Sequence, residues 1–146
     1  MINFIKANRF LFSCLTIIFL SSFIASIVQS SFTKVKIELK ELKTDNGQSL
    51  VYDLYKPKIA NIDNKVPFVI VVPGFQRSKE ALSNIAIELS RRGMAVALID
   101  PYAQGMSSSS VSRIAATTQG YGMFALVDHA YDGNFPFVDT EKIAST

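Results

Sequence analysis

Two short segments, each directly after an apolar run, hold the residues of this 146-residue chain that are best suited to do chemistry. Pro73 and Gly74 open a turn after the first run, and Asp100 opens a loop rich in glycine and serine after the second. An amphipathic segment lies between the two runs, which predicts a strand–helix–strand unit with a right-handed connection. Because the carboxyl ends of parallel strands meet at one edge of a sheet, this unit predicts a backbone-lined pocket at that edge.

Nucleophilic catalysis needs an activated nucleophile beside a base, and the chain offers few such pairs. The serines at 107–110 have no glycine-flanked elbow around them and no identifiable base, so we expect a solvated loop. His129, the only histidine, falls in a predicted helix over residues 121–131 and is expected to be a partly exposed helix residue. Asp100 is expected to hold its own loop together through hydrogen bonds, as aspartates do in turns.

A strand–turn–helix–strand order that ends in an acid is also found at the start of dinucleotide-binding domains. Those domains need several glycines in the turn, so that the backbone can approach the pyrophosphate. The turn at 73–78 reads Pro-Gly-Phe-Gln-Arg-Ser, with one glycine and bulky neighbours. The absent glycine pattern argues against a nucleotide-binding oxidoreductase, and no cofactor is predicted.

Charge and cysteine content exclude several further classes. The formal net charge is +3, but the first thirty residues carry two basic and no acidic side chains, which leaves 13 Lys and Arg against 12 Asp and Glu afterwards. The basic residues show no stripe interleaved with aromatics, so nucleic-acid binding is not indicated. Cys14 is the only cysteine, which excludes an intrachain disulfide and a cysteine-based metal site. No metal site is predicted.

Residues 1–30 form a leader of a different kind from the rest of the chain. Residues 10–28 are uncharged and mostly apolar, and Lys6 and Arg9 precede them. At about 1.5 Å per residue, a helix of this length nearly spans a hydrocarbon core of about 30 Å. The leader is therefore expected to be an uncleaved membrane anchor, with a signal peptide cleaved near Ser30 as the alternative. Lys6 and Arg9 favour a cytoplasmic N-terminus and an extracytoplasmic globular part, either tethered or secreted.

The globular part, residues 31–146, reads as the beginning of an α/β domain. Apolar and polar residues alternate over 34–55 around a Thr-Asp-Asn-Gly turn, which predicts an antiparallel hairpin ended by Pro57. The unbroken apolar runs at 68–72 and 94–99 predict strands buried on both faces, as in a parallel sheet covered by helices. Residues 142–146 look like the opening of a third parallel strand.

The helix between the two buried strands is expected to begin at Ser78, which can cap it, with Glu80 in its first turn. Its apolar face is predicted from the spacing i, i+3, i+4 and i+7, which gives Leu82, Ile85, Ala86 and Leu89. Gly93, after two arginines, is expected to end this helix in a left-handed conformation.

Residues 34–146 resemble the α/β-hydrolase superfamily. Members have an antiparallel hairpin, a buried strand with a His-Gly-type turn, a helix, and a strand that ends in a loop similar to Asp-x-Arg-Gly-x-Gly-x-Ser. Here the turn at 72–75 reads Val-Pro-Gly-Phe, and the loop at 100–107 reads Asp-Pro-Tyr-Ala-Gln-Gly-Met-Ser. The departures are Pro73 for His, Tyr102 for Arg and Ala103 for Gly. The run Val-Asp-Thr-Glu-Lys-Ile at 138–143 is similar to the lead-in to the nucleophile strand of dienelactone-hydrolase-like and acyl-peptidase-like members.

The resemblance implies a sheet in which the strand at 68–72 lies between the strand at 94–99 and the strand that starts at Lys142. It also implies an oxyanion hole with two backbone N–H donors, one of them in the loop after the first buried strand. By resemblance this donor is the N–H of Phe75, with Gln76 as the neighbouring candidate. The second donor follows the nucleophile of a Gly-x-Ser-x-Gly elbow, which is expected to open within about three residues of Thr146 and is not in the sequence.

The resemblance therefore implies the N-terminal portion of an exported or membrane-tethered serine hydrolase for small ester or amide substrates. The family order is Ser, then Asp or Glu, then His, so residues 1–146 are expected to be inactive on their own. A non-catalytic, membrane-tethered α/β module is the alternative. It is disfavoured because a sheet that stopped at the third parallel strand would leave that strand with an unpaired edge.

Overall fold

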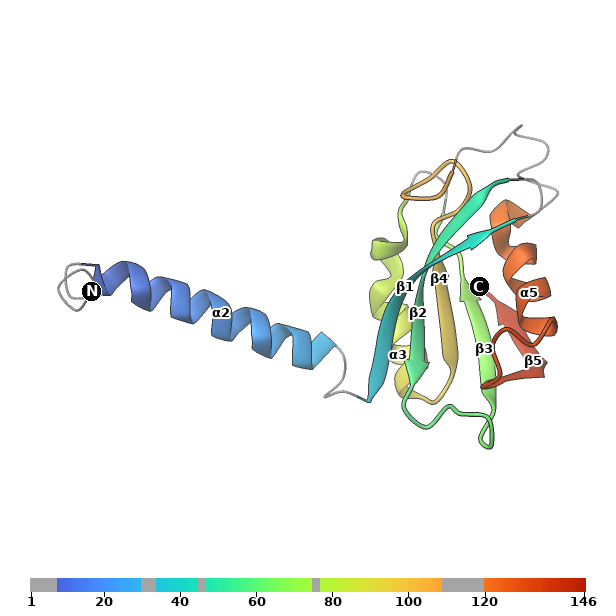
Figure 1. Cartoon of the computed structure of the whole chain (residues 1–146), viewed down its shortest axis with the longest axis horizontal. Helices are drawn as coiled ribbons and strands as arrows, with labels where there is room; N and C mark the ends of the chain where they lie inside the picture. Colours follow the sequence, from blue (N-terminus) through green and yellow to red (C-terminus); the bar gives the residue numbers. More distant parts are fainter. Residues whose placement is uncertain (1–7, 30–33, 45–46, 75–76, 109–119) are drawn as a thin grey trace.

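A five-stranded mixed sheet with helices on both sides makes up the part of the chain after the leader (Figure 1). The computed structural model describes residues 8–29, 34–44, 47–74, 77–108 and 120–146. In chain order the elements are α2 (Arg9–Gln29), β1 (Val35–Lys43), β2 (Ser49–Pro57), β3 (Val66–Val71), the 3-10 turn η1 (Lys79–Leu82), α3 (Ser83–Arg91), β4 (Ala95–Ile99), the 3-10 turn η2 (Gly120–Gly122), α5 (Met123–Tyr131) and β5 (Val138–Ser145).

The strands lie in the order β1-β2-β4-β3-β5. The pairs β1–β2 and β2–β4 are antiparallel, whereas β4–β3 and β3–β5 are parallel. The predicted fold class is confirmed: an antiparallel hairpin leads into parallel βαβ units, after one apolar helix. β3 also lies between β4 and β5, as the resemblance implied.

Of the two strands of the hairpin, β2 is the more buried and has a neighbouring strand on each side, whereas β1 lies at the sheet edge. In β1 only Val35 of the predicted apolar face is buried, and Ile37 and Leu39 are exposed, so the expectation of a half-buried face fails for most of this strand.

The register of the hairpin pairs Val35 with Pro57 at one end and Lys43 with Ser49 at the other. At the turn the N–H of Gly47 donates to the carbonyl of Thr44 at 2.9 Å, and Gly47 takes a φ of 78°, a value that suits glycine. The predicted hairpin is confirmed, and Pro57 is its last residue.

Alternate residues of the inner strands supply two separate cores, one on each face of the sheet. On one face the larger core includes Leu50, Tyr52, Leu54, Phe68 and Ile70 of the strands with Leu126 and Ala130 of α5. On the other face the smaller core includes Val35, Tyr55, Val71, Val96 and Leu98 with Ala86 of α3. Every residue of β4 is buried, which confirms the prediction of a strand covered on both sides.

The start of the first helix differs from the prediction. Ser78 makes no side-chain hydrogen bond to the helix backbone, and a 3-10 turn, η1, precedes α3. The pKa of Glu80 is lowered to about 2, chiefly by hydrogen bonding to the Ser78 side chain, with further contributions from the backbone and from Lys79.

The buried face of α3 is also shifted from the predicted one. Leu82, Ala86 and Leu89 pack into the core as expected, but Ile85 is exposed and Ser90 is buried. The reason is that α3 begins only at Ser83, so the helix phase is set by its contact with β2 and β4 rather than by a run from Ser78. The Ser90 hydroxyl lies 3.4 Å from the carbonyl of Tyr55 in β2, at the centre of that contact.

The end of α3 follows the prediction. Gly93 has a φ of 91°, and its N–H donates to the carbonyl of Ser90 at 3.0 Å. The N–H of Met94 reaches back to the carbonyl of Leu89 at 3.3 Å. This pair of bonds is a Schellman motif, which satisfies the last carbonyls of the helix and turns the chain into β4.

The last two elements are displaced by a few residues from their predicted bounds. α5 begins at Met123, because Gly120, Tyr121 and Gly122 all take left-handed φ values and form the turn η2. β5 begins at Val138 rather than Lys142: Val138 pairs with Val66, and a register shift follows before Ile143 pairs with Phe68. Across that shift Lys142 bonds the Asp139 carboxylate at 2.7 Å, which gives the predicted lead-in a structural role.

The leader forms the helix α2, which extends away from the sheet (Figure 1). It is the one helix in the described part of the chain that is long and apolar enough to cross a membrane. Its large side chains, such as Phe10, Phe19 and Phe23, are mostly exposed. Length and composition of this kind fit both an anchor and a signal sequence.

Candidate functional site

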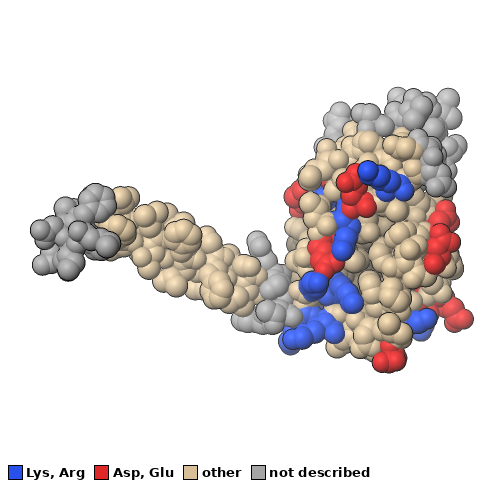
Figure 2. All heavy atoms as spheres, viewed as in Figure 1, with Lys and Arg blue, Asp and Glu red and all other residues tan. Residues whose placement is uncertain are grey.

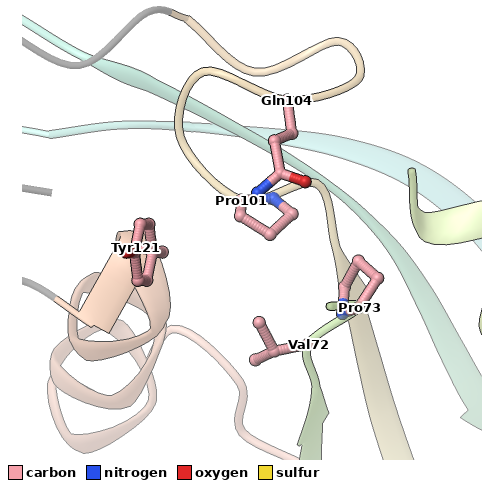
Figure 3. A pocket seen from close by; sticks show the side chains of 5 residues that line it. All are labelled: Val72, Pro73, Pro101, Gln104 and Tyr121. Atoms are coloured by element: carbon pink, nitrogen blue, oxygen red, sulfur yellow. The ribbon is translucent and has the colours of Figure 1, made fainter. Parts of the chain in front are cut away.

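A small hollow of about 100 Å³ lies at the carboxyl ends of β3 and β4. Figure 3 shows the side chains around it, which come from the end of β3, from the loop after β4 and from η2. They are Val72, Pro73, Pro101, Gln104 and Tyr121. The predicted pocket at the strand ends is therefore present, and its lining is apolar apart from one amide and one phenol.

Asp100 holds the two loops of this site in place. Its side chain is fully buried, and one carboxylate oxygen accepts the N–H of Met106 at 3.0 Å, within its own loop. The other oxygen accepts the N–H of Lys79 at 2.8 Å, at the start of η1. The predicted role in its own loop is confirmed. The bond to η1 joins residues 21 positions apart, and nothing in the local sequence indicates it.

The loop after β4 passes very close to this carboxylate. A Cβ atom on Gly105 would lie only 2.2 Å from Cγ of Asp100, and Gly105 has a φ of 53°. Both facts require glycine, which accounts for the glycine that matches the family pattern. Ala103, which departs from that pattern, has a φ of 64°, where a Cβ costs roughly 1–2 kcal/mol.

Tyr102 departs from the family pattern for a reason that the structure makes clear. It is 2% exposed and belongs to the larger core, near Leu50 and Leu126. Its N–H donates to the carbonyl of Tyr121 at 3.1 Å, which ties the loop to η2. Tyr102 thus contributes to packing beside the hollow.

The predicted solvated loop at 107–110 is wrong for its first two serines, which are half-buried. The Ser107 hydroxyl donates to the carbonyl of Asp100 at 2.6 Å and accepts the N–H of Val51 at 2.8 Å. The Ser108 hydroxyl accepts the N–H of Ser49 at 2.8 Å. Both side chains therefore form hydrogen bonds with the first residues of β2, which makes them structural rather than nucleophilic. Residues 109–110 lie outside the described residues.

Gln104 joins the two loops directly above the hollow. Its Oε1 atom accepts the N–H of Arg77 at 3.1 Å, while its side chain lines the hollow (Figure 3). The N–H of Arg77 also approaches the carbonyl of Gly74 at 3.1 Å, which closes the turn after β3. The role of Gln104 could not be predicted from the sequence, because its partner is 27 residues away and a lone glutamine belongs to no pattern.

Lys79 anchors the same turn through its side chain. It is only 4% exposed, and its Nζ lies 3.2 Å from Asp53 of β2 and 3.1 Å from Glu80. Burial lowers the pKa of Lys79, but the hydrogen bonds to Glu80 and Asp53 outweigh it and the net shift is upward. For Asp53 burial dominates and raises the pKa, although Lys79 acts in the opposite direction. This pair was not predicted from the sequence either, since lysines are rarely buried.

Phe75 and Gln76, the residues predicted to supply an oxyanion-hole N–H, lie outside the described residues, so this prediction stays untested. The described residues on either side, Gly74 and Arg77, are within the turn that Gln104 and Asp100 hold. His129 lies on α5, half-buried, with its ring edge-on to Phe135 at 5.0 Å between centroids. That placement agrees with the predicted role as a helix residue. Within the described residues no group of three or more His, Cys, Asp or Glu could hold a metal ion.

No protein-family model and no curated protein matches the sequence. Solved structures do match. The α/β hydrolase GrgF from Penicillium sp. sh18 is 26% identical with a TM-score of 0.62, over 75% of this chain and 36% of GrgF. DcsB, solved in complex with a substrate analogue, is 28% identical with a TM-score of 0.60, over 75% of this chain and 36% of DcsB.

A third structure, Est1E from Butyrivibrio proteoclasticus with ferulic acid bound, is 22% identical with a TM-score of 0.59 and supports the fold alone. The match covers 73% of this chain and 41% of Est1E. The chain thus spans about two fifths or less of the length of these three structures.

Replacing Ala103 with Gly is expected to stabilise the chain by about 0.5–1 kcal/mol. The substitution removes a Cβ that is unfavourable in the left-handed conformation, and this gain exceeds the entropic cost of the more flexible glycine backbone. The measurement is urea unfolding of the detergent-solubilised chain, followed by near-ultraviolet circular dichroism. Ala125→Gly within α5 is the matched control and should destabilise by about 0.5–1 kcal/mol. If both variants lost the same free energy of unfolding, Ala103 would not be strained.

Lys79→Met is expected to destabilise the chain by about 2 kcal/mol at pH 7, because it leaves the Asp53 carboxylate without its cation. Burial raises the pKa of Asp53 and Lys79 lowers it, so removal of Lys79 should raise this pKa further. The folded variant then binds the Asp53 proton more tightly than the intact protein does, and acidification stabilises the variant more. The deficit should therefore shrink as the pH falls from 7 toward about 4, the value in the unfolded chain.

The control is Asp53→Asn combined with Lys79→Met. This double variant removes the unpaired carboxylate at position 53 and keeps the backbone N–H of residue 79, which donates to Asp100. It should recover most of the stability and lose the pH dependence in urea unfolding between pH 4 and 7. If Lys79→Met lost the same free energy of unfolding at pH 4 as at pH 7, the Asp53 carboxylate would not be the cause of its instability.

Proposed function

Because this chain has the N-terminal part of an α/β-hydrolase fold, we propose that it is the N-terminal portion of a serine hydrolase that cleaves small ester or amide substrates. The observation that carries the proposal is the convergence of three parallel strands on the hollow. β3 and β4 end at its lining residues, and Thr146 pairs beside them: Val72 N–H donates to the carbonyl of Thr146 at 3.1 Å. In the family that the fold resembles, the nucleophile follows the strand equivalent to β5.

The turn after β3 is suited to hold an oxyanion donor. An oxyanion hole works because its N–H groups are fixed before the charge develops, and the loss of one donor typically costs about 2.7–4 kcal/mol. Here the turn is fixed at its far side by Gln104 on the Arg77 N–H and by Asp100 on the Lys79 N–H. We assign the donor to the backbone N–H of Phe75, with Gln76 as the neighbouring candidate.

The remaining catalytic groups are proposed to follow residue 146. The sequence contains no Gly-x-Ser-x-Gly. The Ser107 and Ser108 hydroxyls form hydrogen bonds with the backbone, and the His129 ring packs against Phe135. Residues 31–146 are accordingly proposed to be an incomplete hydrolase domain that is inactive by itself. Residues 1–30 are proposed to export it, either as an anchor that leaves the domain extracytoplasmic or as a cleaved signal.

Fluorophosphonate labelling tests the reaction class. The 146-residue chain should not label, whereas the product of the extended reading frame should label on one serine, located by mass spectrometry. Replacement of that serine by alanine should abolish both labelling and hydrolysis of p-nitrophenyl esters. Labelling of Ser107 or Ser108 in the 146-residue chain, or the absence of a Gly-x-Ser-x-Gly after residue 146, would overturn the proposal.

Phe75→Pro tests the oxyanion donor in the extended product, because proline has no backbone N–H. The expected result is a fall in kcat of about 100- to 1000-fold with a much smaller change in KM. Phe75→Ala, which keeps the N–H, should retain most of the activity, and a thermal melt of each variant reports whether the fold is intact. Equal kcat values for the proline and alanine variants would assign the donor elsewhere.

A further inference from the structure

Four lysines gather on one face of the β1–β2 hairpin, at the end nearest the leader. They are Lys34, Lys36, Lys56 and Lys58, here called the lysine face. Lys36 and Lys56 are directly opposite each other in the register, and the N–H of Lys58 donates to the carbonyl of Lys34 at 2.8 Å. Residues opposite each other in antiparallel strands project to the same side, so the four ammonium groups share one surface. Like charges in opposite positions are destabilising.

Within the described residues little compensates this charge. Glu38 is the acid beside the lysine face, and it contacts both Lys36 and Lys40. Those two ammonium groups hold the pKa of Glu38 at about 2, so it stays ionised and is already shared. The Lys56 Nζ lies over the ring of Phe137, 4.3 Å from its centroid, which positions the charge without neutralising it. An external anion would relieve the repulsion.

The lysine face lies beside the point where the apolar helix ends. Lys34 comes five positions after Gln29, the last residue of α2. The guanidinium of Arg91, at the end of α3, donates to the carbonyl of Val28 in α2 at 3.4 Å. Figure 2 shows blue side chains gathered on the domain next to the base of this helix. A membrane that holds α2 would therefore bring its headgroups close to these charges.

We propose that the lysine face docks the domain on anionic phospholipid headgroups of the membrane that α2 enters. This inference rests on the proposed membrane segment but not on the hydrolase activity. Each lysine near an anionic bilayer contributes about 1 kcal/mol, or about a fivefold change in the ratio of docked to free domain. The tether supplies the proximity, so a few such contacts suffice to orient the hollow relative to the bilayer.

Lysine footprinting of the full chain tests this surface. The chain is reconstituted in vesicles of phosphatidylcholine alone or with about 30% phosphatidylglycerol, and acetylation of each lysine is followed by mass spectrometry. Acetylation of the lysine face should be about tenfold or more slower in the anionic vesicles at low salt, and the difference should vanish at about 0.5 M salt. Lys43, at the other end of β1, and Lys142 on β5 are internal references and should change little.

The variant Lys34→Gln with Lys58→Gln leaves Lys56 on Phe137 and should restore fast acetylation of Lys36 and Lys56 in the anionic vesicles. Equal rates in the two vesicle types, or uniform slowing that includes Lys43, would overturn the docking surface. Extraction with alkaline carbonate distinguishes absence of the docking surface from absence of the anchor. A chain inserted through α2 stays with both vesicle types after extraction, whereas a chain that is not inserted is released from both.

Discussion

The buried carboxylate of Asp100 is the interaction on which the site depends. It lies at the carboxyl end of a fully buried strand, and its two oxygens accept N–H groups from two different loops. A buried carboxylate is costly unless hydrogen bonds satisfy it, so both loops are held in the conformations that supply those donors. The absence of a side chain on Gly105 follows from the same constraint, because any Cβ there would occupy the position of the carboxylate.

Further contacts depend on that arrangement. Once η1 is held against Asp100, the Lys79 side chain reaches Asp53 and the N–H of Arg77 reaches Gln104. The turn after β3 is thus held on its C-terminal side by three separate bonds, two of them to the loop after β4. Oxyanion stabilisation requires donors that are fixed before the charge develops. The proposed role of Phe75 therefore rests on its backbone N–H rather than on the identity of its side chain.

The departures from the family pattern are compensated locally. Tyr102 replaces a charged residue with a buried ring in the larger core, and it keeps the loop attached to η2 through its N–H. Ala103 keeps the left-handed turn that a glycine would make more easily. The backbone path of the loop is therefore retained while its side chains change.

Much of this fold could be predicted from local patterns. The hairpin over 34–55, the two unbroken apolar runs and the left-handed Gly93 each depend on residues close in sequence, and all three agree with the structure. The half-buried face expected for the first strand does not, because Ile37 and Leu39 lie exposed on an edge strand. The sheet order followed from the family resemblance, and the role of Asp100 in its own loop from turn chemistry. The prediction for Phe75 depends on residues outside those described and stays a prediction.

The predictions that were wrong, and the contacts that were not predicted, involve residues distant in sequence. The phase of α3, with Ile85 exposed and Ser90 buried, is decided by packing on β2 and β4. The serines at 107 and 108 are structural because strand pairing places the start of β2 beside them. The sequence by itself determined the strands, the helices, the apolar leader and the approximate place of the pocket, because periodicity and turn chemistry act over a few residues. Only the tertiary structure decided which polar groups meet across 21 to 59 residues, and hence how the loops around the hollow are held.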